Sequence, residues 1–160
     1  MLPADAFALS NADDDYGMKM LEGIKAKKYT YGAKNQADFS EKPETKLLGK
    51  FNEYNTLAVY AAAVLLGATL EEYLRGWVEA SGLNLGSRNP SLNKYMAILL
   101  QSDLITKQDS KDIQAWGGLR NHAAHGEWSE VENRQRVSLM LEGVNLFMRK
   151  YESSSSIDAG

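Results

Sequence analysis

The chain has 160 residues, a length that suits one domain with its own hydrophobic core. Its apolar fraction of 44% and charged fraction of 24% are ordinary for a soluble globular protein, and the absence of cysteine excludes disulfides and thiolate metal sites. The net charge of -3 argues against a broad nucleic-acid-binding surface, because such surfaces usually carry a basic patch.

The sequence also predicts a cytoplasmic protein without a membrane anchor. Its longest apolar run, residues 57–68, is shorter than the roughly 20 residues that a transmembrane helix needs. The N-terminus lacks the basic start and apolar stretch of a signal peptide.

The first 49 residues are expected to form a less regular N-terminal extension. Residues 1–15 combine small residues with three adjacent aspartates, which predicts poor order. A short helix is possible over residues 16–28, and the next stretch, to residue 45, has the composition of a connection. Its basic, tyrosine-containing start, residues 27–31, could touch nucleic acid or form a plain solvated loop.

The most strongly helical stretch follows at residues 53–81. Its first half is apolar nearly all round, which in a soluble protein indicates a helix buried on most faces. Gly82 is a natural helix stop. This segment is predicted to be the central helix of a bundle.

Three further helices are expected from their start signals. Asn89 with Pro90 begins one, Thr106 begins the next as N-cap, and a capping box over residues 129–132 begins the last. No stretch shows convincing period-two alternation, so the predicted fold is all-α, an up-and-down helical bundle. Three apolar side chains from three helices are expected to be mostly buried: Leu65, Trp116 and Leu141.

These elements divide the chain into three parts. Residues 1–49 are the extension, residues 50–152 the helical bundle, and residues 153–160, with their serine run, a flexible tail.

The stretch with the most chemistry is residues 117–126, which holds both histidines of the chain. Histidine is the usual proton shuttle near neutral pH, and the planar fork of Arg120 suits phosphate. Asn121 and His125 are four residues apart and project from one helical face. This combination of side chains suits a phosphodiester-cleaving site that uses no metal. The alternative is a set of polar residues at a helix end.

Other chemistries are less well supported by the residues. A His-x-x-His pair could bind a metal, but three protein ligands are normally needed and Glu127 is the one acidic residue close by. No glycine-rich phosphate loop is present. We therefore expect neither a metal nor a cofactor.

At this point the sequence resembles the HEPN domain family. Leu119-Arg120-Asn121-x-Ala123-Ala124-His125-Gly126 is similar to the family's R-x4-6-H motif, and the order of helices over residues 50–152 is similar too. The resemblance implies a HEPN-type bundle and a metal-independent endoribonuclease of a toxin–antitoxin, phage-defence or RNA-processing system. His125 would be the general acid/base, Arg120 would stabilise phosphate charge, and Asn121 would orient substrate or His125. His122, which lies outside the motif, and Glu127 would contact the substrate.

The same resemblance implies partners. RNA is the expected substrate, and a homodimer would form through the motif helices, where small residues allow close approach. An antitoxin or a nucleotidyltransferase is a possible further partner. In the alternative reading the chain is a non-catalytic HEPN dimerisation or interaction module beside a nucleotidyltransferase or nuclease.

Overall fold

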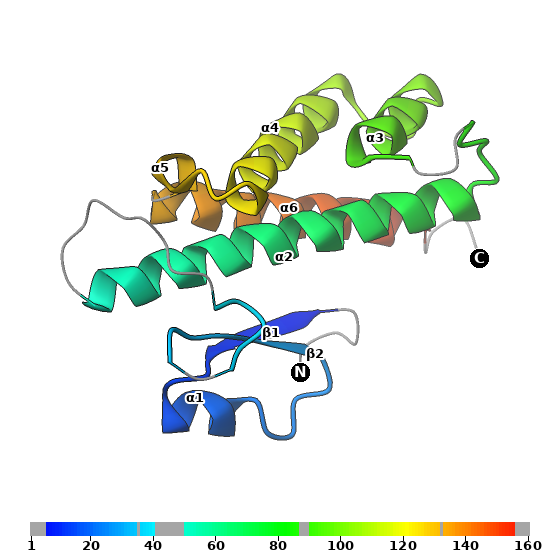
Figure 1. Ribbon diagram of the computed structural model, residues 1–160. Helices are drawn as coiled ribbons and strands as arrows, with labels where there is room; N and C mark the ends of the chain where they lie inside the picture. Colours follow the sequence, from blue (N-terminus) through cyan, green and yellow to red (C-terminus); the bar gives the residue numbers. More distant parts are fainter. Residues whose placement is uncertain (1–5, 35, 41–49, 87–89, 132, 156–160) are drawn as a thin grey trace. The chain divides into compact units, whose positions relative to one another are not determined.

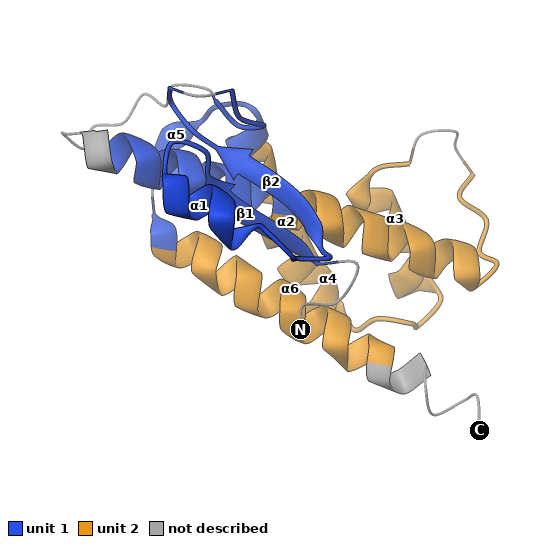
Figure 2. Cartoon of the chain, turned by 90° about the horizontal axis from the view of Figure 1, so that it is seen from below, with its two compact units in different colours: residues 1–65, 122–134 blue, residues 66–121, 135–160 orange. Residues whose placement is uncertain are grey.

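The computed structural model describes residues 6–34, 36–40, 50–86, 90–131 and 133–155, and these form two compact units (Figures 1 and 2). Unit 1 comprises residues 1–65 and 122–134, and unit 2 comprises residues 66–121 and 135–160. Helices α2 and α4 each continue from one unit into the other.

Unit 1 contains a small β-α-β arrangement in the segment for which the sequence analysis expected no strand. Strand β1 (Phe7–Asn11) is followed by helix α1 (Asp15–Met20) and strand β2 (Lys27–Tyr31). The strands pair in parallel, with Phe7 opposite Lys27 and Asn11 opposite Tyr31. Parallel strands need a crossover connection of a dozen residues or more, and α1 lies in that connection.

The expectation of poor order over residues 1–15 is wrong for β1 and the start of α1, while residues 1–5 lie outside the described part. Asp14 accepts a hydrogen bond from the backbone N–H of Tyr16 at 3.0 Å, so one of the three aspartates caps α1. The expected helix over residues 16–28 is shorter than predicted.

The long central helix is confirmed as α2 (Lys50–Ala80). The apolar run within it is part of a helix that is long and apolar enough, by length and composition, to cross a membrane. Half of that apolar window is buried inside the protein, as in the core helix of a globular fold. Gly82 follows with a φ of 66°, so the expected stop is also confirmed.

The remaining helices are α3 (Leu92–Gln101), α4 (Lys107–Ala124), α5 (Trp128–Val131) and α6 (Arg134–Ser155). Thr106 caps α4 as predicted, since the backbone N–H of Asp109 donates to its hydroxyl at 3.1 Å. The predicted capping box at residues 129–132 is wrong, because Ser129 lies inside α5. Asn89 lies outside the described residues, and Ser91 precedes α3.

Within unit 2 the side chains show how the helices run. Tyr73 and Trp77 of α2 meet Phe147 and Tyr151 of α6 in the same order, so these two segments are parallel. Asp109, early in α4, bonds Lys150 and Tyr151, whereas Trp116 meets Phe147. Helix α4 is therefore antiparallel to α6.

The side chains expected in the core are only partly there. Leu65 is 7% exposed, whereas Trp116 is half-buried and Leu141 is 43% exposed. The inner face of α6 is instead formed by Val137, Met140, Val144 and Phe147. Leu141 belongs to a periodic apolar series, but it lies at the edge of the apolar face, next to the side of α6 that faces solvent. The helical part agrees with an up-and-down bundle, and that fold class stays a prediction.

Candidate functional site

The predicted motif lies at the C-terminal end of α4. The helix ends because Gly126 adopts a φ of 68°, which a residue without a Cβ reaches at no steric cost. The Gly126 N–H donates to the Ala123 carbonyl at 3.0 Å, and the Glu127 N–H donates to the His122 carbonyl at 2.9 Å. These two bonds form a Schellman motif, which satisfies carbonyls that the helix leaves unpaired.

Arg120 is held within unit 2 by a carboxylate and an amide. Its guanidinium lies 3.6 Å from Glu71 of α2 and donates to the Asn121 side chain at 3.2 Å. Gly67 provides the space for this arrangement, because a Cβ there would lie 2.1 Å from the Arg120 Cγ. The arginine therefore has an anionic neighbour, and a phosphate would have to compete with Glu71 for it.

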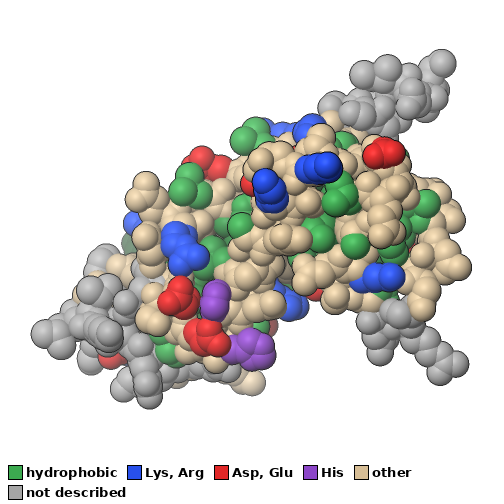
Figure 3. Space-filling model, turned by 90° about the horizontal axis from the view of Figure 1, so that it is seen from above, with side chains coloured by type: hydrophobic (Ala, Val, Ile, Leu, Met, Phe, Trp, Pro, Cys, Tyr) green, Lys and Arg blue, Asp and Glu red, His purple; other side chains and the backbone are tan. Residues whose placement is uncertain are grey.

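The histidines and Glu127 lie in unit 1. His122 Nδ1 is hydrogen-bonded to the Glu127 carboxylate, five residues on. His125 is exposed and makes no hydrogen bond or ion pair with the residues that the structure describes. Figure 3 shows both histidines at the surface with acidic side chains beside them.

The five predicted site residues thus fall into two sets, one in each unit. Arg120 and Asn121 belong to unit 2 with Glu71, while His122, His125 and Glu127 belong to unit 1. Their assignment to a functional site stays a prediction. Among the described residues, no group of three histidine, aspartate or glutamate side chains could hold a metal ion.

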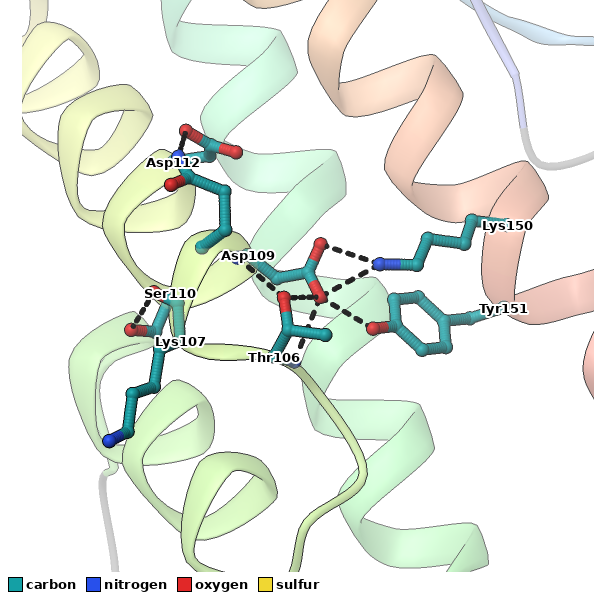
Figure 4. Close-up of polar contacts among 8 residues, drawn as sticks. Thr106, Lys107, Asp109, Ser110, Asp112, Lys150 and Tyr151 are labelled. Carbon is teal, nitrogen blue, oxygen red and sulfur yellow. Dashed lines mark hydrogen bonds and ion pairs between the residues drawn. The ribbon is translucent and has the colours of Figure 1, made fainter.

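Sequence reasoning missed a polar cluster in unit 2 centred on Asp109 (Figure 4). The carboxylate accepts hydrogen bonds from the Thr106 hydroxyl at 2.6 Å, the Tyr151 hydroxyl at 2.6 Å and the Lys150 ammonium at 2.9 Å. Burial alone would raise the pKa of Asp109, but the bonds from Thr106, Tyr151 and Lys150 lower it to about 2. With every oxygen occupied, Asp109 is a clamp between α4 and α6 and not an acid–base catalyst.

A second missed cluster lies in unit 1 at the carboxyl end of β1. The Asp13 carboxylate accepts hydrogen bonds from the backbone N–H groups of Ala33 and Lys34, at 2.6 and 2.9 Å, and from the Tyr54 hydroxyl at 2.8 Å. The bond to Asp13 raises the pKa of Tyr54. The aspartate run was visible in the sequence, but its partners lie 20 to 41 residues away.

The Asp13 cluster lies beyond the carboxyl ends of both strands. In sheets of parallel strands, ligands bind beyond the carboxyl ends of the strands. Asp13 follows β1, and Ala33 and Lys34 follow β2, so one carboxylate fixes the loops at both carboxyl ends.

Comparisons with known proteins point away from the HEPN family. No family model matches the chain, and no solved structure matches it. The curated relatives are all named UDP-N-acetylmuramoyl-L-alanyl-D-glutamate--2,6-diaminopimelate ligase.

Three of these relatives show the extent of the similarity. The ligase of Parabacteroides distasonis is 47% identical over 90 residues, covering 46% of this chain and 18% of the ligase. The Cytophaga hutchinsonii ligase is 43% identical with the same coverage. The Bacteroides thetaiotaomicron ligase is 32% identical over 114 residues, 61% of this chain and 22% of the ligase. The chain therefore spans about a fifth of the length of these relatives.

These similarities overturn several predictions. The HEPN resemblance is wrong as a guide to function, because an eight-residue motif and an order of helices are weaker evidence than identity over 90 residues. With it fall the endoribonuclease, the toxin–antitoxin, phage-defence and RNA-processing roles, and the alternative of a non-catalytic HEPN interaction module. The expected partners fall as well: RNA, a homodimer through the motif helices, and an antitoxin or nucleotidyltransferase. The chain is similar to part of a ligase that joins 2,6-diaminopimelate to a UDP-linked muramyl dipeptide.

Proposed function

We propose that this chain binds the UDP-linked muramyl peptide on which its ligase relatives act, and that it does so as a binding part and not as a complete ligase. The observation that carries this proposal is the 47% identity over 90 residues. The proposal is restricted to binding because the similarity covers about a fifth of those ligases and so does not carry their whole activity.

The carboxyl edge of the β1–β2 pair is the best-supported place for that ligand. The UDP-linked dipeptide is an anion, carrying a diphosphate and carboxylates. Lys34, exposed beyond β2, supplies a cation at this edge, and Asp13 fixes its backbone at 2.9 Å. In this proposal Lys34 contacts the anion directly, and Asp13 is a positioning residue.

The proposed location is the cytoplasm. This is the location expected from the sequence, and the UDP-linked substrate in the names of the relatives supports it, because a UDP-linked compound is made from a nucleotide.

Calorimetric titration of the whole chain with UDP-N-acetylmuramoyl-L-alanyl-D-glutamate tests the proposal. We expect binding, and we expect Lys34→Glu to weaken it at least tenfold, because a favourable charge pair becomes a repulsive one. Lys28→Glu is the matched control: it changes the same charge at an exposed position of β2 away from this edge.

Two results would contradict the proposal. An absence of heat with the wild-type chain would exclude binding, and equal losses in Lys34→Glu and Lys28→Glu would exclude the carboxyl edge as the site. A parallel assay with ATP, Mg²⁺ and labelled 2,6-diaminopimelate should show no product, since ligation by the chain alone would make it a complete catalyst.

A further inference from the structure

The carboxylate of Asp13 is held in place by the ends of both strands. On the side of β1, the Asp13 N–H donates to the Asn11 side-chain oxygen at 2.9 Å, in a turn that fixes where the residue lies. On the side of β2, a Cβ at residue 32 would lie 3.2 Å from the carboxylate carbon of Asp13. The carboxylate therefore lies close against the backbone of Gly32, at the start of the loop that follows β2.

One oxygen of this carboxylate accepts hydrogen bonds from two distant segments. Asp13 Oδ2 accepts from the Ala33 N–H at 2.6 Å and from the Lys34 N–H at 2.9 Å. The Tyr54 hydroxyl donates to the same oxygen at 2.8 Å. Tyr54 belongs to α2, 41 residues after Asp13, and its side chain is half-buried. The phenol of α2 and the loop after β2 thus share one acceptor atom.

The loop that bears Lys34 is fixed differently at its two ends. At its far end, the Thr30 N–H and the Thr30 hydroxyl both donate to the Asp38 carboxylate, at 2.8 and 2.9 Å. At its start, where the exposed Lys34 lies, the backbone is bonded to Asp13. The orientation of the Asp13 carboxylate therefore decides how the backbone of Lys34 is held.

We propose that Tyr54 is a positioning residue for the ligand at this edge: by fixing the Asp13 carboxylate, it orders the backbone of Ala33 and Lys34 before the ligand arrives. The inference rests on the proposed function, in which Lys34 contacts the anion. A segment that is already ordered loses less conformational freedom on binding, so the affinity is higher. Without the hydroxyl of Tyr54, the carboxylate can turn away from the loop, and the ordering of Lys34 then falls to the binding step and weakens it.

Amide hydrogen exchange without any ligand tests the first step. Tyr54→Phe removes only the hydroxyl, and we expect the Ala33 and Lys34 amides to exchange roughly threefold to tenfold faster, as for the loss of one hydrogen bond. Tyr73→Phe is the matched control, because it is the same change on the same helix, at a hydroxyl that donates to the Met148 carbonyl in unit 2. Unchanged exchange in Tyr54→Phe overturns the proposal. Slower exchange overturns it too, since the phenol would then compete with the loop for the carboxylate.

A double-mutant cycle tests the second step, with UDP-N-acetylmuramoyl-L-alanyl-D-glutamate as the titrant in calorimetry. Tyr54→Phe should weaken binding roughly threefold to tenfold, whereas Tyr73→Phe should leave it unchanged. In the Lys34→Gln background the cation is absent, so Tyr54→Phe should weaken binding little further. Equal losses in the two backgrounds would mean that Tyr54 acts on the site by another route, and would overturn its role in positioning Lys34.

The two measurements separate this inference from the proposed function. If the wild-type chain does not bind the titrant, the proposed function fails before any variant is compared. If the wild-type chain binds and the cycle is additive, the proposed function stands and the role of Tyr54 falls. The exchange measurement uses no ligand, so it decides in either case whether Tyr54 orders the loop.

Discussion

At the scale of single residues, the position of Gly67 explains how Arg120 comes to lie across α2. A Cβ at residue 67 would lie 2.1 Å from the Arg120 Cγ and 2.7 Å from its Cβ. These atoms are near the backbone of α4 and cannot swing away without moving the helix. The glycine is thus required by packing and not by its conformational freedom.

We predict that Gly67→Ala lowers the free energy of unfolding by about 1–3 kcal/mol, the usual cost of overpacking. Gly76 of the same helix is the control, since a Cβ there meets nothing within 4 Å. Gly76→Ala should instead stabilise the protein by roughly 0.5–1 kcal/mol, because alanine is the better helix former. Urea denaturation measures both, and equal effects of the two substitutions would contradict this account of Gly67.

Asp109 gives the second prediction at this scale. Its pKa is lowered from 3.8 to about 2 in the folded protein, so the stabilisation is present above pH 3.8 and is lost as the pH falls through about 2. We expect Asp109→Asn to cost about 2 kcal/mol at pH 7, from a shift of nearly two pKa units. The difference from wild type should shrink between pH 4 and pH 2.

Asp112→Asn is the matched control for that experiment. Asp112 lies on the same helix, and its side chain accepts a bond from Gln108 at the surface. Chemical denaturation at several pH values should show little change for this variant. A pH-independent loss in Asp109→Asn would show that the carboxylate's charge is not what stabilises the clamp.

At the scale of elements, the sequence predicted the long helices better than it predicted the strands. The central helix and the Thr106 cap of α4 follow from local patterns, because apolar spacing and capping are decided within a few residues. The pairing of β1 with β2 is decided by contacts across a crossover, and five-residue strands show too little alternation to be recognised.

The site residues show the same division. The sequence identified Arg120, but its neighbour Glu71 lies on another helix, and nothing local connects the two. Likewise, Thr106 was recognised as a helix start, whereas Lys150 and Tyr151 join the Asp109 cluster from the far end of the chain. A single sequence therefore predicts the residues of each cluster that are close together in the chain, but not the partners that tertiary packing brings from other helices.

The different exposure of two neighbouring side chains on α6 predicts which face of the helix is packed. Met140 is 1% exposed and its neighbour Leu139 is 59% exposed, although both are large and apolar. Met140→Ala should therefore cost about 2–5 kcal/mol, as is usual for a buried side chain. Leu139→Ala should change the free energy of unfolding by less than about 0.5 kcal/mol. Thermal denaturation of the two variants measures both effects. A larger loss of stability in Leu139→Ala than in Met140→Ala would mean that the other face of α6 is the packed one.

At the scale of the whole molecule, each unit contains its own polar clamp. Asp13 bonds the loop after β2 and Tyr54, all in unit 1, whereas Asp109 bonds Thr106, Lys150 and Tyr151, all in unit 2. Each carboxylate accepts hydrogen bonds from segments distant in sequence: the Tyr54 and Tyr151 side chains are half-buried, and the other donor residues of the two clusters are exposed. Removing either carboxylate takes the hydrogen-bond acceptor away from donors of its own unit.

We predict from this division that the two clamps act locally, and amide hydrogen exchange can measure it. Asp13→Ala should speed exchange at Ala33 and Lys34, whose N–H groups lose their acceptor, and leave the start of α4 protected. Asp109→Asn should do the opposite, exposing the Thr106 N–H, which the Asp109 carboxylate accepts at 2.8 Å, and sparing the loop after β2. Equal acceleration in both units by either substitution would contradict this prediction, because it would mean that the chain opens as one cooperative body.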